Sequence, residues 1–496
     1  MEAQAVAQRR RKLAFFWPER WLTPGNTRRL DTVFLVVLPV LFLFFLSLDE
    51  PVRSLACTLT VAIFLYEILI YERAEIYGLS GLRILSFPAV AYVSFTAMLA
   101  IPSVWVVLNE PSRAADTFFY AVNSFYLLFP LGLLFANYFF RIDLDQVGRL
   151  GRQNLVRPVS SQRVYVFLII LLVVCLAIMG RHISRMESVP LIELILNPGE
   201  KVKLAWLRLE SINLLDIPAV EIYLYSWART ALYGVGVIAS LFMAVITRER
   251  RFRVLFVVFL VFGLFNNSLT IAKAHTAALV LALALFFFLK NRGRISTRLM
   301  AVSMAAVFAF PYIVIKFTAG VPFTFSRVLY LLWLRTFYVP AWVLKKYFEI
   351  FPTYHSFLGG RTSHLYSWLH PEGHFPVANW LFQTLDVSTV TAGLASANYM
   401  SFFWADFGWV GIIVSSLLVG MVTHYIYWVL LRTCHYLKDV IYVTTVTVLA
   451  MSFSFYFAGA NFPILIISHG IILFVLAFWM ITSFRTRYEK PKSGVV

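Results

Sequence analysis

Charged residues are scarce in this sequence. Asp, Glu, Lys and Arg make up only 14% of the 496 residues, whereas hydrophobic residues make up 60%. Because a soluble globular domain carries about 25% charged residues, this composition excludes an ordinary soluble protein. Apolar runs recur along the chain. Their length, about 18 residues or more, is that of helices that span the ~30 Å hydrocarbon core, whereas the strands of an outer-membrane barrel are only ~10 residues long. We therefore predict an all-α, polytopic membrane protein.

Cysteine is rare as well. The three cysteines, Cys57, Cys175 and Cys434, lie in or beside apolar runs, with no paired spacing and no companion histidine. The sequence therefore predicts no disulfide framework, no metal centre and no cofactor. Acidic residues are also few, since 25 Asp and Glu stand against 43 Lys and Arg, for a net charge of +18. In a membrane protein such an excess is typical of cytoplasmic loops, so no nucleic-acid partner is expected.

The apolar runs predict about twelve membrane-spanning helices. Their approximate ranges are 32–48, 54–70, 84–108, 117–140, 164–180, 228–247, 254–271, 276–289, 299–318, 403–431, 440–457 and 463–483. Most of the 43 Lys and Arg then fall in segments assigned to the cytoplasm, including RRRK at 9–12 and the tail RTRYEKPK. Both termini are therefore predicted to be cytoplasmic, and the first apolar run is predicted to be an uncleaved helix and not a signal peptide.

Two longer polar segments remain within this single 1–496 transmembrane domain, and both are predicted to face outward. Residues 181–227 carry mixed charge, and residues 319–401 form the main outer loop. The apolar stretch 328–344 could be counted as a further span, but that count would place the basic tail outside, against the positive-inside rule. We predict that it is a surface or partly re-entrant helix.

The segment 319–401 concentrates side chains that could carry chemistry. Arg327 and Arg335 are about two helical turns apart, so a continuous helix places them on roughly the same side. Their guanidinium groups could hold phosphate oxygens, or they could reach lipid headgroups from an interfacial helix. Lys273, in a tight turn between two predicted spans, could contact a substrate phosphate or only reach the membrane surface.

Further candidates lie in the loop FLGGRTSHLYSWLHPEGHFP. Arg361 could bind a phosphate, and a neutral His364 or His374 could act as a general base toward a substrate hydroxyl, although each histidine could equally be an ordinary loop residue. The final HPEGH run contains Pro and Gly, so it is not the helical zinc motif H-E-x-x-H. Trp368 could stack on a sugar ring, although packing is the commoner use of such aromatics.

The stretch 398–411 carries a resemblance to a known family. Asn398, followed by FGWVG at 407–411 entering a helix, resembles the O-antigen polymerase (Wzy) and O-antigen ligase families of bacterial inner-membrane glycosyltransferases. The segment with KKYF at 345–348 and GGR at 359–361 is similar to the outer loop of oligosaccharide repeat-unit polymerases. Ala397 stands where the ligases, and many related polymerases, carry a histidine, which argues against a ligase and leaves no base at that position.

The resemblance implies a metal-independent, GT-C-like glycosyltransferase in the bacterial inner (cytoplasmic) membrane, with surface helices in a large periplasmic loop. Its substrates would be undecaprenyl-pyrophosphate-linked oligosaccharides, joined into O-antigen or another exopolysaccharide among membrane lipids, with a chain-length regulator as a further partner. Arg361, His364 and His374 would be catalytic, and Arg327, Arg335, Lys273, Asn398 and Trp368 would bind pyrophosphate or glycan. An O-antigen ligase-like enzyme and a lipid-linked oligosaccharide flippase or transporter remain alternatives.

Overall fold

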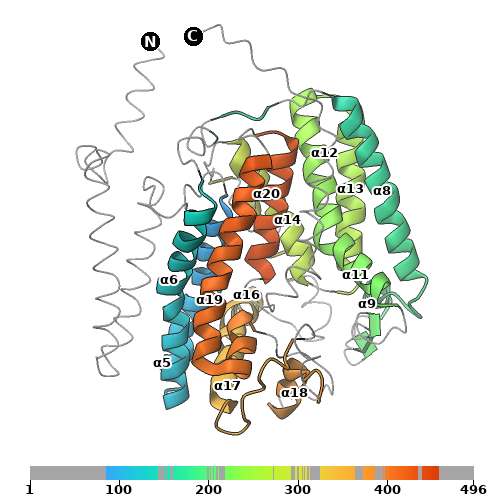
Figure 1. The fold of residues 1–496 in the computed structure, drawn as a ribbon. Coiled ribbons are helices and arrows are strands. Elements are labelled where there is room, and N and C mark those ends of the chain that lie inside the picture. Colours follow the sequence, from blue (N-terminus) through green and yellow to red (C-terminus); the bar gives the residue numbers. More distant parts are fainter. Residues whose placement is uncertain are drawn as a thin grey trace.

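The regular structure of the described residues is entirely helical, which confirms the predicted all-α class. The computed structural model describes residues between 85 and 456 (Figure 1), with the largest gaps at 143–149, 212–217, 292–296, 313–323, 364–371, 386–394 and 434–437 and shorter gaps elsewhere. The predicted spans at 32–48, 54–70 and 463–483, most of the span at 299–318, and both termini lie outside the described residues.

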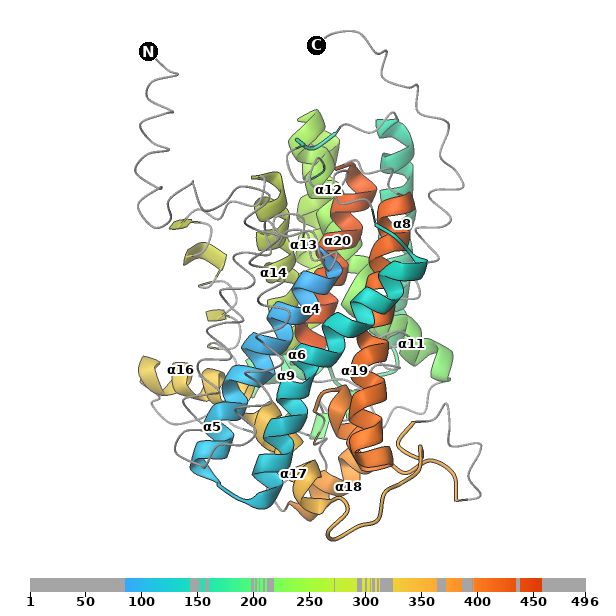
Figure 2. The ribbon, with the colours of Figure 1, turned by 60° about the vertical axis from the view of Figure 1, so that its left-hand side comes forward.

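The helices form an elongated bundle with short elements at one end (Figures 1 and 2). In chain order they are α4 (Phe87–Phe95), η4 (Thr96–Ala100), α5 (Ile101–Asn109), α6 (Arg113–Phe139), α8 (Ser161–Ile183), α9 (Pro190–Leu196), α11 (Ala219–Trp227), η6 (Ala228–Leu232), α12 (Tyr233–Thr247), α13 (Arg250–Ser268), α14 (Lys273–Lys290), α16 (Phe325–Trp333), η7 (Leu334–Tyr338), α17 (Val339–Ile350), α18 (Val377–Thr384), α19 (Tyr399–Thr433) and α20 (Val440–Tyr456). The three η elements are π-helical turns within longer helices.

Six helices in the described part of the chain are long and apolar enough to cross a membrane. They are Phe87–Asn109, Arg113–Phe139, Ser161–Ile183, Val220–Thr247, Arg250–Ser268 and Tyr399–Arg432, and two shorter apolar helices are His275–Lys290 and Val440–Leu449. Each of these eight helices coincides with a predicted span. The membrane character of the protein is thereby supported.

One span begins earlier than predicted. The sequence predicts its start at about residue 228, but the apolar helix extends back to Val220 through η6 and α11. Arg229 lies in the π-turn inside this helix, and backbone hydrogen bonding continues through the turn. The last part of the segment 181–227 therefore belongs to an apolar helix and not to a loop.

Side-chain caps set the starts of two long helices. The Oγ of Ser112 accepts a hydrogen bond from the backbone N–H of Ala115 at 3.1 Å, at the start of α6. The Oγ of Ser160 accepts one from the backbone N–H of Arg163 at 3.4 Å, at the start of α8. Each cap satisfies a backbone donor that the first helical turn leaves unpaired. The two starts lie at opposite ends of the bundle (Figure 1).

The two ends of the bundle differ in charge. At one end, which we call the basic end, are the α12–α13 turn, the start of α8 and the last turns of α14 and α19, with Arg163, Arg248, Arg250, Arg251, Arg253, Lys290 and Arg432. At the opposite end, the loop end, are the α5–α6 turn, α17 and α18, where acidic and basic residues are mixed. The segments 181–227 and 319–401 were predicted to face outward. Their described parts lie at the loop end or in helices that begin there.

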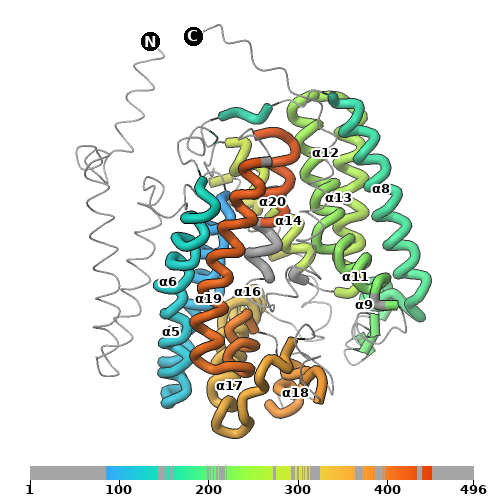
Figure 3. Tube along the Cα trace, viewed as in Figure 1, coloured from blue at the N-terminus to red at the C-terminus, as the bar shows by residue number. Residues whose placement is uncertain are grey.

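Close backbone packing joins α6 to α19, which run side by side (Figures 1 and 3). A Cβ atom added to Gly132 would overlap the carbonyl oxygen of Leu417, and one added to Gly420 would overlap the carbonyl oxygen of Phe129. Small residues at such crossings let two membrane helices approach closely enough for their backbones to touch. The pair therefore fixes the position of α19, whose first turns carry the candidate site.

Gly420→Ala is accordingly expected to destabilise the protein by about 1 to 3 kcal/mol, because the obstructing atom is backbone and cannot rotate away. Gly180→Ala is the matched control, since no atom lies within 4 Å of its added Cβ. That control should be neutral or slightly stabilising, because alanine favours helix over glycine by up to about 1 kcal/mol. Thermal unfolding of the purified protein in detergent measures both. Equal melting temperatures for the two variants would contradict the packing argument.

Candidate functional site

The Arg361 loop, which we define as residues 357–363 and 372–376, is fastened to the start of α19. The backbone N–H of Leu358 donates to the carbonyl of Ala405 at 2.9 Å, and that of Gly359 donates to the carbonyl of Asp406 at 3.0 Å. The two arms of the loop are joined where the backbone N–H of Phe375 donates to the carbonyl of Arg361 at 2.9 Å. The loop is thus held by main-chain hydrogen bonds to a long helix.

Asp406 is the side-chain anchor of this loop. It is only 5% exposed, and its carboxylate accepts a hydrogen bond from the backbone N–H of Thr362 at 3.2 Å and another from the Thr362 hydroxyl. Hydrogen bonds to an ionised group are about twice as strong as neutral ones, so this pair holds the loop firmly. Neither residue is among those predicted from the sequence. The available signal was an acidic residue beside the FGWVG run in an otherwise apolar helix.

Arg361 points its guanidinium to the edge of the loop. It forms an ion pair with Glu372, and its Nε donates to the carbonyl of Gly373 at 3.2 Å. The Arg361 side chain is 20% exposed and that of Glu372 is 73% exposed. An ion pair with so exposed a partner contributes little to stability, about 0 to 1 kcal/mol. An incoming anion can therefore replace Glu372 at the guanidinium.

His374, another residue predicted to be catalytic, lies beside Arg361. Its Nδ1 is 3.1 Å from the carbonyl oxygen of Arg361. In the neutral ring this contact requires the proton on Nδ1, which leaves the lone pair on Nε2. The loop thus brings a cation and a nitrogen base together. His364 and Trp368 lie outside the described residues.

Asn398 is a helix cap and not a surface contact. It is fully buried, its Oδ1 accepts from the backbone N–H of Met400 at 3.1 Å, and its carbonyl accepts from the Ser401 hydroxyl at 2.7 Å. Its Nδ2 is buried without a hydrogen-bond partner. The residue predicted to bind substrate therefore begins α19, and it supports the site by orienting that helix.

Two of the predicted phosphate-binding residues lie on a helix that leads away from the Arg361 loop (Figure 2). Arg327 in α16 and Arg335 in η7 are exposed on one continuous helix with α17. At ~1.5 Å per residue they lie about 36 Å and 24 Å along this helix from Phe351, where the chain turns toward the Arg361 loop. Figure 2 shows α16 reaching sideways from the loop end, away from α18, as expected of a surface helix. Lys273 begins α14, and its side chain is not described.

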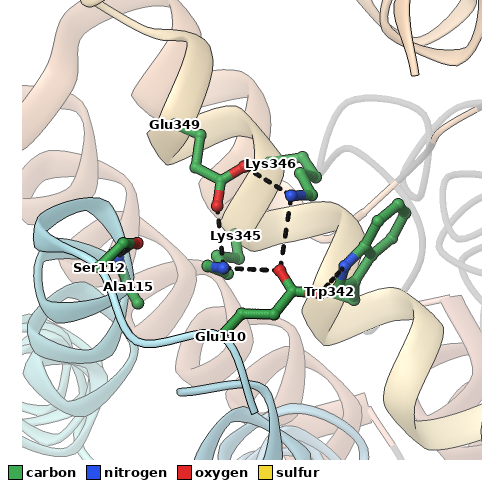
Figure 4. A network of polar contacts seen from close by, with 7 residues as sticks. All are labelled: Glu110, Ser112, Ala115, Trp342, Lys345, Lys346 and Glu349. Carbon is green, nitrogen blue, oxygen red and sulfur yellow. Dashed lines mark hydrogen bonds and ion pairs between the residues drawn. The ribbon is translucent and has the colours of Figure 1, made fainter. Parts of the chain in front are cut away.

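A second polar network at the loop end ties α17 to the α5–α6 turn (Figure 4). The Nζ of Lys345, a residue that is 1% exposed, lies 2.7 Å from the Glu110 carboxylate and 2.9 Å from that of Glu349. Lys346 bonds the same Glu349 at 2.7 Å, and the indole N–H of Trp342 donates to Glu110 at 3.0 Å. Both lysines of the KKYF run are thus neutralised within the protein, so their role is to hold α17 in place.

This network makes the stability of the folded protein decrease at acid pH. Burial by itself raises the pKa of Glu110, but hydrogen bonds from Lys345 and Trp342 and the lysine charges outweigh it and hold that pKa below its ordinary 4.5. The pKa of Glu349 is lowered in the same way by Lys345 and Lys346, against the opposing effect of burial. As the pH falls, these carboxyls take up protons in the unfolded chain, near pH 4.5, before they do so in the folded protein. The network therefore stabilises the folded protein above about pH 4.5, and this stabilisation is lost as the pH falls below it.

We expect the melting temperature to be nearly flat from pH 7 to about pH 5 and to fall below about pH 4.5. In Glu110→Gln/Glu349→Gln the fall should be shallower, because the two titrating groups are gone. Thermal unfolding across this pH series measures both slopes. An identical pH dependence in the double variant would show that other carboxyls are responsible.

No protein family model, no curated protein and no solved structure matches this chain. Among the described residues there is also no group of three or more His, Cys, Asp or Glu that could hold a metal ion. The candidate site is thus defined by its own geometry. It offers one replaceable cation, one nitrogen base and a rigid support.

Proposed function

We propose that this protein is a polysaccharide polymerase that joins undecaprenyl-pyrophosphate-linked repeat units at the Arg361 loop. The observation that carries the proposal is the Arg361–Glu372 pair beside His374. A reaction that releases pyrophosphate needs a cation where negative charge develops and a base for the attacking hydroxyl. The resemblance of residues 398–411 to the O-antigen polymerases supports the same reaction.

In the proposed reaction a sugar hydroxyl of one repeat unit attacks the anomeric carbon of a second glycan. A new glycosidic C–O bond forms, and the C–O bond to the pyrophosphate carrier breaks. His374 takes the hydroxyl proton through Nε2, while Arg361 exchanges Glu372 for the departing pyrophosphate. The products are a lengthened lipid-linked glycan and free undecaprenyl pyrophosphate.

The charge of the two ends supports the membrane placement that we propose. By the positive-inside rule the basic end would lie in the cytoplasm, and the loop end would face the periplasm of the bacterial inner membrane. This orientation is compatible with the proposed GT-C-like architecture, which has about twelve spans and both termini in the cytoplasm. The polyprenyl chain of the substrate would lie in the bilayer beside the apolar helices, with its pyrophosphate at the level of the loop.

The decisive experiment incubates the purified protein in detergent with an undecaprenyl-pyrophosphate-linked repeat unit. We expect a ladder of products that differ by one repeat unit, resolved by gel electrophoresis or mass spectrometry. Transfer of glycan to lipid A without a ladder would favour an O-antigen ligase-like enzyme. Movement of the unchanged substrate across proteoliposomes would favour a flippase. Either of these last two results would overturn the proposed polymerase.

A further inference from the structure

A further polar cluster, largely buried, lies between α8, α11 with η6, and α13, on helices other than those of the Arg361 loop (Figure 1). We call it the Arg229 cluster. The Nη1 of Arg229 donates to the Thr270 hydroxyl at 3.1 Å, and its guanidinium carbon lies 5.4 Å from the centre of the Tyr225 ring. The His182 ring stacks on Tyr225 at 3.4 Å and 14°. The π-turn of η6 places this cation inside a candidate membrane span.

Arg229 has no carboxylate partner among the described residues. The nearest acid on its own helix is Glu221, and both of its oxygens already accept from Arg181 at 3.2 Å. The Nε of Arg229 is buried without a hydrogen-bond partner. A charge inside a membrane span is costly unless it is paired, and such residues usually pair or mark a substrate pathway. The missing counter-charge points to an anionic ligand.

Asn266 and Asn267, at the end of α13, add unpaired amide atoms to the cluster, although the Nδ2 of Asn267 donates to the carbonyl of His275 at 3.1 Å. Asn266 is fully buried, and neither its Nδ2 nor its Oδ1 has a partner; the Oδ1 of Asn267 is unpaired as well. The phenol of Tyr225 donates to the backbone carbonyl of Asn266 at 3.5 Å. Thr270, one helical turn further along the chain, accepts from Arg229, so this end of α13 lies against the cluster. Leaving one buried polar group unpaired costs about 1 to 3 kcal/mol. Several such groups around one cation indicate a site made for a polar ligand.

The donors and acceptors select the class of ligand. The described residues supply one permanent positive charge, which balances a single negative charge and suits a carboxylate held by the guanidinium fork. The amide oxygens of Asn266 and Asn267 are acceptors, so the ligand must also supply hydroxyl donors. A pyrophosphate diester carries two charges and no hydroxyl donors. We propose that the Arg229 cluster binds the carboxylate and neighbouring hydroxyls of an acidic sugar. This inference rests on the proposed function, because it specifies the glycan.

Methyl glucuronide and methyl glucoside are suitable probes, since they differ only at the carboxylate. We expect the full-length protein to bind the glucuronide at least about tenfold more tightly, as measured by calorimetry or ligand-observed NMR. Arg229→Gln should remove this preference, and Arg229→Lys should keep part of it, because the charge remains without the planar fork. Arg432→Gln, the same change at the basic end, should retain the full preference. Equal affinities for the two sugars in the unaltered protein would overturn the inference.

Asn266→Asp gives a second test that does not depend on the arginine variants. The new carboxylate would occupy the place proposed for the ligand, so it should raise the melting temperature and abolish glucuronide binding. A lower melting temperature with unchanged glucuronide binding would overturn the inference. Tighter binding of inorganic pyrophosphate than of glucuronide, lost in Arg229→Gln, would also overturn it and assign the cluster to the lipid carrier. Binding is measured without chain growth, so the absence of a product ladder contradicts the proposed polymerase separately.

Discussion

Arg361→Gln is expected to slow chain growth by about 100-fold to 1,000-fold, the usual effect of removing one group that stabilises developing negative charge. The guanidinium is the cation that the Arg361 loop presents at its edge, and its carboxylate partner among the described residues is the exposed Glu372. The melting temperature should stay nearly constant, because an ion pair with an exposed partner contributes little to folding. The product ladder gives the rate, and thermal unfolding gives the stability.

Two further variants sharpen this prediction. Glu372→Gln removes the carboxylate that competes with the substrate, so KM should fall. Arg432→Gln, at the basic end, loses the same charge far from the loop and should leave chain growth unchanged. If Arg361→Gln kept the rate of the unaltered protein, pyrophosphate would have to leave elsewhere, and the assignment of Arg361 would be wrong.

Gly408→Ala is expected to have the largest effect on stability. Gly408 has φ 58° and ψ −135° inside α19, a backbone conformation open mainly to glycine. An added Cβ would also lie 2.8 Å from the Phe357 ring, which packs against the kink from the Arg361 loop. We expect a loss of about 1 to 3 kcal/mol from the backbone alone. Chain growth should fall as well, since Asp406 anchors the loop two residues earlier.

Two comparisons separate the backbone and contact effects at Gly408. Gly373 has φ 70° but no atom within 4 Å of an added Cβ, so Gly373→Ala reports the backbone effect alone and should be milder. Gly408→Ala/Phe357→Ala removes the obstructing ring and should recover part of the activity of the single variant. Thermal unfolding and the product ladder measure both. A melting temperature for Gly408→Ala equal to that of Gly373→Ala would show that the Phe357 contact is unimportant.

The helical membrane character could be predicted from the sequence because it depends on local composition. Apolar runs without charges must form helices in lipid, where every backbone group needs a partner within its own segment. The closeness of Arg361 to His374 was also predictable, because both lie in one short loop. The span that becomes α19 was predicted from the same local pattern, but its start at Tyr399 and the role of Asn398 as a buried cap were not.

Long-range pairing was not predictable. Thr362 and Asp406 are 44 residues apart, and Lys345 and Glu110 are 235 residues apart. Composition alone gives no reason to pair them, because many acids and bases lie at the loop end. Arg229 was hidden for another reason. It was assigned to the first residues of a span, and only the packing of α8 and α13 shows that no carboxylate of the described residues pairs with it.

The sequence by itself therefore determined a helical membrane protein with charge segregated between its two ends and with the start of α19 as a distinctive segment. The tertiary structure decided which polar groups meet there. It separated Arg327 and Arg335 from Arg361, because a continuous helix of fixed rise keeps them apart, and it made Asp406 the anchor of the loop. Hydrophobicity acts on each segment locally, whereas these contacts depend on how segments distant in sequence pack together.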